Sequence, residues 1–283
     1  MSKPILNKSP LAMVLVDLRF TPLPARTLSD GLELFRERLF HKGFSVPHEA
    51  EMNQIEVIPQ GNNQPNIKTT ITKRWDYLKT AKDQCVTLTE GSLTLRSTVY
   101  NKFEEFYETW DMILCAFFEV FENIENAGML RLGLRHMDVF MASRGNKLTD
   151  YINKDWLTPQ QLTSDDNTVF FNRCIQKTAH GVLRVEIEER LPENGFINIL
   201  PRDIVDPEPV SLTLVDKPYW QNFNGNKFAI VDIDHAWTSQ REFPSLTKDN
   251  ISHRLHNLYN ENSSVFWGLL SEKAEEEWEK SFQ

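Results

Sequence analysis

Cysteine and glycine are both scarce in this chain, and each shortage excludes a familiar kind of site. Cys85, Cys115 and Cys174 are the only cysteines among 283 residues, and no two of them form a Cys-x-x-Cys pair. An odd number of widely spaced cysteines argues against a disulfide framework and favours a reducing compartment. Glycine occurs 11 times, never as Gly-x-Gly-x-x-Gly or Gly-x-x-x-x-Gly-Lys. Nucleotide and dinucleotide cofactors therefore have no support in the sequence, and we expect no cofactor.

Positive charge and long apolar runs are also in short supply. Lysine and arginine total 31 against 40 acidic residues, which gives a formal net charge of −9. A protein that holds a phosphate backbone usually carries a basic field, so we do not expect nucleic acid as a general partner. No apolar run approaches the roughly 18 residues that cross a bilayer, and the first residues lack a secretory apolar core. We expect a cytoplasmic protein without membrane contact.

The first half of the sequence predicts one strand, one helix, a meander of strands and a second helix. Residues 11–20 alternate in the manner of a half-buried strand. We expect a helix after it, with Ser29 as its N-cap and its end near Gly43. Residues 49–99 are rich in β-formers, with a turn over GNNQPN. Residues 101–124 carry apolar side chains in steps of three and four, which indicates a helix packed across a sheet.

The second half repeats this order. A strand over 129–140 precedes short helical stretches between residues 147 and 162, a hairpin around His180–Gly181 and a long excursion over 192–226. A strand over 226–237 and helices over 246–261 and 271–281 follow, the last with Ser271 as its N-cap. We therefore predict an α+β fold of two similar halves, 1–127 and 128–283. Each half is expected to be a curved antiparallel sheet with a long helix packed across one face.

Charged residues of several strands, including Asp17 and Arg19 of the first, are expected to share one face. The stretch MLRLGLRHMDVF, residues 129–140, places Arg131 and Arg135 on the face opposite its leucines. The same alternation selects Arg184 and Glu186 in one strand and Asp232 and Asp234 in another. One interpretation is an exposed sheet face stabilised by cross-strand ion pairs. The other is a cleft between the halves, in which arginine binds a carboxylate or phosphate through two hydrogen bonds.

Aromatic residues of the 192–226 excursion are a second candidate site. Trp220 and Phe223 lie there among proline and asparagine residues. Long loops in compact domains are usually functional or disordered, and aromatic side chains are common at protein-recognition surfaces. Recognition and simple packing onto the body of the protein are both open.

Catalytic and metal sites have weaker support. A strand would place Asp232 and Asp234 on one side and His235 on the other, so one ion could not easily bind all three. His253 and His256 have a chelating spacing but no accompanying motif, and His136 lies on an apolar strand face, as core histidines do. No nucleophile motif such as Gly-x-Ser-x-Gly occurs. We therefore assign no catalytic residue and no metal ligand.

Several short motifs resemble those of a sporadically distributed prokaryotic family without an assigned activity. They are Pro10–Leu11 with Arg19–Phe20, the stretch from Arg131 to Arg135, the stretch from Asp232 to His235, and His256, Phe266 and Trp278. They extend over nearly the whole chain. The sporadic distribution of the family resembles that of mobile defence or toxin–antitoxin cassettes.

Two functional hypotheses follow. The first is a non-enzymatic binding protein that recognises a protein partner through the cleft between the halves or through the 192–226 loop, as one component of a defence or toxin–antitoxin-like cassette. The second is a small-ligand-binding protein or hydrolase that acts on a phosphorylated or carboxylated substrate. The candidate binding residues are Arg131, Arg135, Arg184, Glu186, Asp232, Asp234, Trp220 and Phe223.

Overall fold

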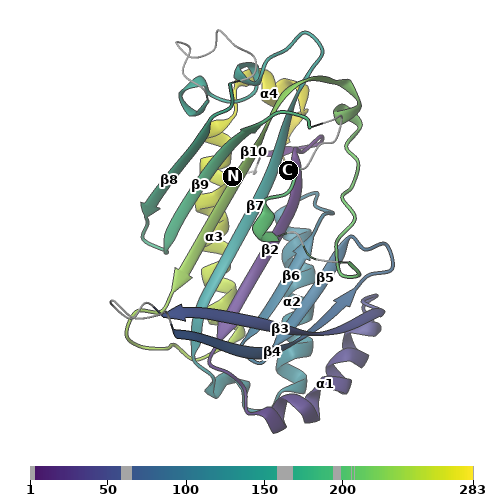
Figure 1. The fold of residues 1–283 in the computed structure, drawn as a ribbon, viewed down its shortest axis with the longest axis vertical. Coiled ribbons are helices and arrows are strands. Elements are labelled where there is room, and N and C mark those ends of the chain that lie inside the picture. Colours follow the sequence, from purple (N-terminus) through teal and green to yellow (C-terminus); the bar gives the residue numbers. More distant parts are fainter. Residues whose placement is uncertain are drawn as a thin grey trace.

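A nine-stranded antiparallel sheet forms the body of the protein (Figure 1). The computed structural model describes residues 4–58, 66–157, 168–193, 199–204, 206 and 208–282. The strands follow one another across the sheet in the order β3-β4-β5-β6-β2-β7-β10-β9-β8. Their bounds are β2 Leu11–Phe20, β3 Val46–Ile58, β4 Asn66–Leu78, β5 Gln84–Thr89, β6 Ser92–Ser97, β7 Met129–Ser143, β8 Phe171–Lys177, β9 Val182–Arg190 and β10 Phe223–Thr238.

The sheet is continuous across the predicted boundary between residues 127 and 128. The strands predicted to open the two halves, β2 and β7, pair directly, with Val16 opposite Leu134. Every other pairing in the sheet is antiparallel as well. The α+β class and the antiparallel strands are therefore confirmed, whereas the division into two similar halves stays a prediction.

Long helices cover one face of this sheet (Figure 1). The helices are α1 Ala25–Phe40, α2 Phe103–Val120, α3 Lys248–Leu269 and α4 Glu272–Glu277. The apolar stripe predicted for α2 is buried, including Phe106, Trp110 and Phe117. Burying one such side chain contributes about 1.5–3 kcal/mol, so the stripe fixes α2 on the sheet.

The two ends of the chain meet in a small second sheet that the sequence did not predict. Strand β1, Pro4–Leu6, pairs with β11, Lys280–Phe282. Behind this pair, Trp278 stacks on Tyr151 with ring centroids 5.5 Å apart and contacts Phe140. The ends are thereby fixed against the core of β7.

Several predicted bounds need correction. Ser29 does not cap α1, because the helix already begins at Ala25 and the Ser29 hydroxyl donates to the carbonyl of Arg26 within it. Helix α3 continues to Leu269 instead of ending at 261. Ser271 is confirmed as an N-cap, since its hydroxyl accepts from the amide of Ala274. The predicted turn over residues 61–66, apart from its last residue, and the helical residues 158–162 lie outside the described residues.

Within the described ranges, no helix has both the length and the apolar character that a membrane crossing requires.

Candidate functional site

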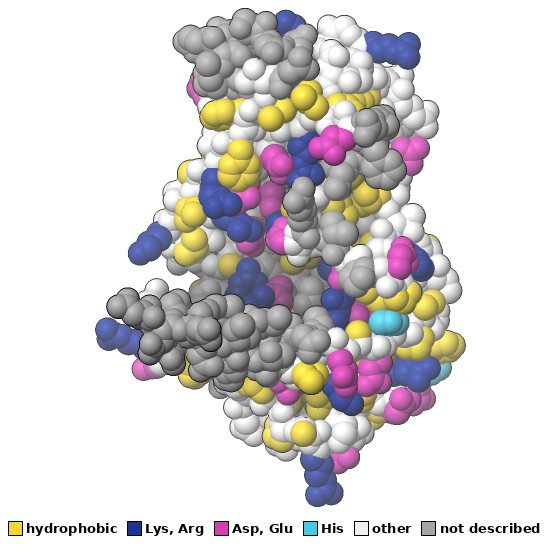
Figure 2. Space-filling model, viewed as in Figure 1, with side chains coloured by type: hydrophobic (Ala, Val, Ile, Leu, Met, Phe, Trp, Pro, Cys, Tyr) yellow, Lys and Arg dark blue, Asp and Glu magenta, His cyan; other side chains and the backbone are white. Residues whose placement is uncertain are grey.

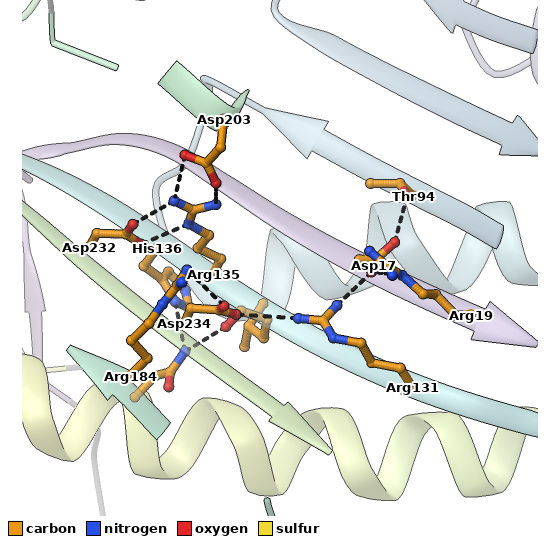
Figure 3. Close-up of polar contacts among 12 residues, drawn as sticks. Asp17, Arg19, Thr94, Arg131, Arg135, His136, Arg184, Asp203, Asp232 and Asp234 are labelled. Atoms are coloured by element: carbon orange, nitrogen blue, oxygen red, sulfur yellow. Dashed lines mark hydrogen bonds and ion pairs between the residues drawn. The ribbon is translucent and has the colours of Figure 1, made fainter. Parts of the chain in front are cut away.

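Six of the eight predicted site residues lie together on the sheet face opposite the helices. Arg131 and Arg135 of β7 face Asp232 and Asp234 of β10, and Arg184 follows on β9 (Figure 3). Glu186 lies two residues after Arg184 in the same strand. The predicted alternation of these strands is therefore correct. In Figure 2, basic and acidic side chains gather in a hollowed part of this face. We call this surface the charged face.

Arg135 is the most extensively bonded side chain of the charged face. Its Nε and Nη2 atoms donate to the two carboxylate oxygens of Asp232 at 2.8 and 2.5 Å. Its Nη1 and Nη2 atoms also donate to Asp203, at 2.6 and 3.3 Å. Burial lowers the pKa of Arg135, but the bonds to Asp232 and Asp203 more than offset it and raise that pKa. The guanidinium is therefore permanently charged and held between two carboxylates.

The two aspartates of this cluster respond differently to their surroundings. Asp232 is 4% exposed, and burial raises the pKa of its carboxyl group, although the hydrogen bonds from Arg135 oppose the shift. Asp203 is exposed, and the same guanidinium lowers its pKa. Of the two carboxylates that bind Arg135, Asp203 is thus the one that can be displaced, because water can solvate it when it separates from the guanidinium.

A second chain of ion pairs runs from β2 to β9. Asp17 accepts from Arg131 at 2.5 Å, and Arg131 lies 3.6 Å from Asp234. Asp234 also lies 3.2 Å from Arg184, which approaches Glu186 at 3.5 Å. Every predicted arginine of the charged face is therefore already paired with carboxylates.

The 192–226 excursion crosses the charged face as a strap, by which we mean residues 199–204, 206 and 208–217. Asp203 bonds Arg135, and Asp206 forms ion pairs with Arg74 of β4 and Arg96 of β6. Further along, the amide of Thr213 donates to the carbonyl of Lys82 at 2.7 Å. The strap thus bridges distant strands of the sheet through acidic side chains.

Trp220 and Phe223 lie on the same side of the sheet as the charged face, but they pack on apolar residues there and not on its ionic side chains. Both are partly buried and pack on a core cluster that includes Val139, Phe228 and Ile230. Their neighbours are the apolar residues of β7 and β10, which gives them a packing role in this structure.

A pocket of about 270 Å³ opens beside Arg135. Its charged lining consists of three arginines and four carboxylates, and Phe171, Pro201 and Ile230 contribute apolar surface. The charged members are Arg135, Arg173, Arg184, Glu186, Glu188, Asp203 and Asp232. Because the carboxylates outnumber the guanidinium groups, a free anion would meet a net negative lining.

Strand β8 forms the outer border of the charged face. It is the last strand of the sheet, and within the described ranges no strand pairs with its outer edge. Phe171 and Ile175 are 49% and 63% exposed, and Arg173 lies between them at 2.6 Å from Glu186. An edge strand with exposed apolar side chains offers both backbone groups and apolar surface to a second chain.

The other predicted histidine and metal candidates lie behind the sheet or on α3. His235 is fully buried, and its Nε2 atom lies 3.0 Å from the hydroxyl of Thr178. His256 contacts the carbonyl of Ser252 in its own helix. In the part of the chain that the structure describes, no three metal-binding side chains come together.

Sequence reasoning missed Asp203, Asp206 and the cluster around Asp76. Asp76 is fully buried and accepts from Arg74 and from Thr87 at 2.5 Å. The alternation of Arg74 and Asp76 in β4 was a usable signal, because two opposite charges share one face there. Asp203 and Asp206 lie in irregular chain without periodicity, so no local signal identified them.

Comparison with known proteins does not identify a family. No protein-family model matches this chain, and no curated protein matches it. The geometry of the charged face and of β8 is therefore the basis for a functional assignment.

Proposed function

We propose that this protein is a non-enzymatic recognition protein that binds an extended segment of a protein partner along β8. The observation that carries the proposal is the outer edge of β8, with Phe171 and Ile175 exposed beside the charged face. A segment added to this edge would gain main-chain hydrogen bonds from the strand and side-chain contacts from the same face.

The side chains of β8 indicate what the partner segment contains. Phe171, Arg173, Ile175 and Lys177 alternate along one face of the strand, and all four are exposed. Apolar side chains in the partner would pack against Phe171 and Ile175. Acidic side chains between them would pair with Arg173 and Lys177. The expected segment is therefore extended, with alternating apolar and acidic residues.

The alternative of a small anionic ligand or a hydrolase substrate is less well supported. Each arginine of the 270 Å³ pocket already holds a carboxylate, and the pocket lining carries more acids than arginines. An anion would have to displace Asp203 from Arg135 and would still face Asp232 nearby. A protein segment that binds at β8 leaves these ion pairs in place.

The cellular setting is part of the same proposal. The resemblance of the short motifs to a sporadically distributed prokaryotic family implies the partner component of a defence or toxin–antitoxin-like cassette. The three cysteines are free, which is consistent with the reducing cytoplasm that we propose as its location. The gene for the partner would then lie close to the gene for this protein.

A quantitative pull-down from the native host tests the proposal. The bait proteins are the wild type, a Phe171→Ala/Ile175→Ala variant and a Phe243→Ala control, because Phe243 is 60% exposed at a different place. We expect the wild type and the control to recover the same partner and the β8 variant to lose most of it. Equal recovery by all three proteins, or no partner at all, would contradict the proposal.

A further inference from the structure

A pocket on the helix-covered side of the sheet has no carboxylate among its described lining residues. It has a volume of about 220 Å³ and lies between the N-terminal half of α3, the end of β10 and the turn that joins β8 to β9. We call it the α3 pocket. Its polar and aromatic lining consists of His180, Trp237, Asn250, His253, Arg254 and Asn257. In a chain with a formal net charge of −9, this recess is locally positive.

Arg254 carries the permanent charge of the α3 pocket, and no described carboxylate pairs with it. Its guanidinium carbon Cζ lies 4.0 Å from the centre of the Trp237 ring, in a cation–π contact. Its Nε atom is buried without a hydrogen-bond acceptor. Burial lowers the pKa of Arg254, whereas two aspartates raise the pKa of Arg135. The charge of Arg254 is therefore not compensated by the described chain.

The contact with Trp237 occupies the flat face of the Arg254 guanidinium and leaves its edge available. All five N–H donors of a guanidinium lie in its plane. No described residue accepts a hydrogen bond from the Nη atoms of Arg254, which lines the α3 pocket. A partly desolvated donor without an acceptor costs free energy, so an acceptor from outside the chain would satisfy it.

Neighbouring side chains place further hydrogen-bond donors around the same space. Nδ2 of Asn250 donates to the carbonyl of Ser245 at 3.1 Å, which fixes the amide orientation and leaves a second N–H on that nitrogen. Nε2 of His253 lies 3.2 Å from the side-chain nitrogen of Asn257. His180 belongs to the β8–β9 turn. The donors of the α3 pocket therefore come from two separate parts of the fold.

We propose that the α3 pocket binds the phosphate group of a small anionic ligand, with Arg254 as its main contact and His180 and His253 as further donors. The guanidinium edge would bind two phosphate oxygens, while its face stays on Trp237. A phosphate group has more acceptor oxygens than a carboxylate, so it can use donors from α3 and from the β8–β9 turn together. The bound group would thereby connect these two elements.

The size of the α3 pocket suits such a ligand. An apolar cavity of ~150 Å³ accommodates benzene, so about 220 Å³ leaves room for a phosphate group and a small organic substituent. The lining shares no residue with the charged face or with strand β8. The proposal therefore does not depend on the recognition of a protein partner at β8.

Other pockets of the described chain suit an anion less well. The pocket beside Arg135 contains four carboxylates. A pocket of about 380 Å³ beside β1 contains three lysines, but two of them, Lys8 and Lys102, form ion pairs with Glu279 and Glu105. An anion would have to displace those carboxylates, whereas Arg254 has none to release.

The cavity on the helix side of β7 is smaller, at about 90 Å³, and contains His136 and Asp138. Burial raises the pKa of Asp138 to about 8 and lowers that of His136 to about 4. Both side chains are therefore neutral at neutral pH and offer no charge to an anion. This volume is also below the ~150 Å³ that accommodates benzene, so we assign no organic ligand to this cavity.

A metal ion is the main competing occupant of the α3 pocket, because His180 and His253 both offer imidazole nitrogens. In the described parts of the chain, however, no three metal-binding side chains come together. Glu261 lies 3.9 Å from Nε2 of His180 but is not part of the described lining. The permanent charge of Arg254 would repel a metal ion, whereas it attracts a phosphate group.

Calorimetric titration of the full chain at constant ionic strength tests the proposal. The probes are inorganic phosphate, methyl phosphate, acetate and chloride. We expect at least one of the two phosphates to bind about tenfold or more tightly than acetate and chloride. Comparable binding of methyl phosphate identifies a phosphate ester as the ligand type, and binding of inorganic phosphate alone identifies the free anion. Absence of binding by both phosphates, or equal binding of acetate or chloride, would overturn the proposal.

Substitutions at Arg254 locate the bound anion. Arg254→Met keeps an apolar chain over Trp237 but removes the guanidinium, so we expect the phosphate affinity to fall about tenfold or more. Arg254→Lys keeps the charge without the planar fork and should have an intermediate affinity. Arg26→Met is the matched control, because the Arg26 side chain is 92% exposed on α1, and it should leave the affinity unchanged. Equal affinity of Arg254→Met and the wild type would contradict the assignment.

A measurement on the wild type keeps the proposal testable if Arg254→Met fails to fold. Phenylglyoxal modifies accessible arginine side chains, and mass spectrometry of the digested protein locates each modified residue. Saturating phosphate should slow the modification of Arg254 about tenfold, because the bound anion covers the guanidinium edge. Arg26 in the same sample should react at an unchanged rate. Equal slowing at both arginines, or none at Arg254, would overturn the role of Arg254.

Discussion

Arg135 of β7 and Asp232 of β10 share two hydrogen bonds, of 2.8 and 2.5 Å, although only 8% and 4% of the two residues is exposed. A buried pair of this kind stabilises the fold mainly by keeping each charge satisfied. Asp203, the second carboxylate bound to Arg135, is exposed. It contributes less to stability, because water can replace the guanidinium as its hydrogen-bond partner.

Replacing either Arg135 or Asp232 alone should destabilise the fold strongly, whereas replacing both together should not. We expect Arg135→Met to lower the free energy of unfolding by about 3–5 kcal/mol, since Asp232 then stays buried without a cation. Arg135→Met combined with Asp232→Leu should recover most of that loss. Asp203→Asn should cost less than about 1 kcal/mol. Urea denaturation measures all three, and a double variant as unstable as Arg135→Met would contradict this account.

Asp138 should make the unfolding free energy depend on pH in a recognisable direction. Its pKa is about 8 in the fold and ordinary in the unfolded chain, so the folded state holds the extra proton between about pH 4 and pH 8. Stability from this group is therefore lost as pH rises through that range. His136, with a pKa of about 4 in the fold, acts in the opposite direction between about pH 4 and 6.5.

The two effects separate above the ordinary pKa of histidine. Between about pH 6.5 and pH 8 the wild type should lose roughly 2 kcal/mol relative to Asp138→Asn, which has no proton to release there. Thermal or urea unfolding of both proteins at the two pH values measures the difference. A constant difference between the proteins would show that Asp138 titrates normally.

Two glycines in helices should respond to alanine with opposite signs. A Cβ atom at Gly31 of α1 would come within 2.6 Å of the Phe121 ring, whereas nothing lies within 4 Å of such an atom at Gly268 of α3. Gly268→Ala should therefore stabilise the protein by about 0.5–1 kcal/mol, as expected from helix propensity. Gly31→Ala should destabilise it by about 1–3 kcal/mol, because the aromatic core around Phe35 and Phe121 must shift. A change of the same sign in the free energy of unfolding of both variants would contradict the packing described here.

The strap should become more mobile when Asp206, which holds it to β4 and β6, is replaced. Asp206 pairs with both Arg74 and Arg96, so Asp206→Asn weakens two ion pairs at once. We expect faster hydrogen exchange at the amide of Thr213, which bonds to Lys82, and little change in the sheet beneath. Asp203→Asn, which removes the exposed carboxylate that bonds Arg135, is the matched control and should change the exchange of the Thr213 amide less. Unchanged exchange in the Asp206 variant would mean that the strap is held by its apolar contacts alone.

Local periodicity predicted which segments form helices and strands better than it predicted which segments lie next to one another. The alternation in β7 and β10 correctly separated Arg135 and Asp232 from the apolar side chains, because a strand exposes every second residue to one environment. The stripe of α2 was equally clear. Ser29 was misassigned because serine is a common N-cap residue, whereas the N-cap position of α1 is Pro24 and the helix starts at Ala25.

Features that depend on distant pairing left no local signal. The pairing of β1 with β11 joins two three-residue segments at opposite ends of the chain. Similarly, nothing within FNRCIQK shows that β8 is the last strand of the sheet, since this depends on the order of all nine strands. Asp203 and Asp206 reach the charged face only because the strap folds back over it. Sequence reasoning therefore located the charged face but not its acidic strap or its open border.

The most direct test of the proposed recognition mode is hydrogen exchange at the backbone amides of β8 with and without the purified partner. Only alternate amides of an antiparallel edge strand bond to the inner neighbour, so the others face outward and exchange freely. We predict that these outward amides between Phe171 and Lys177 become protected from exchange when the partner binds. Binding that leaves their exchange unchanged would contradict the central claim.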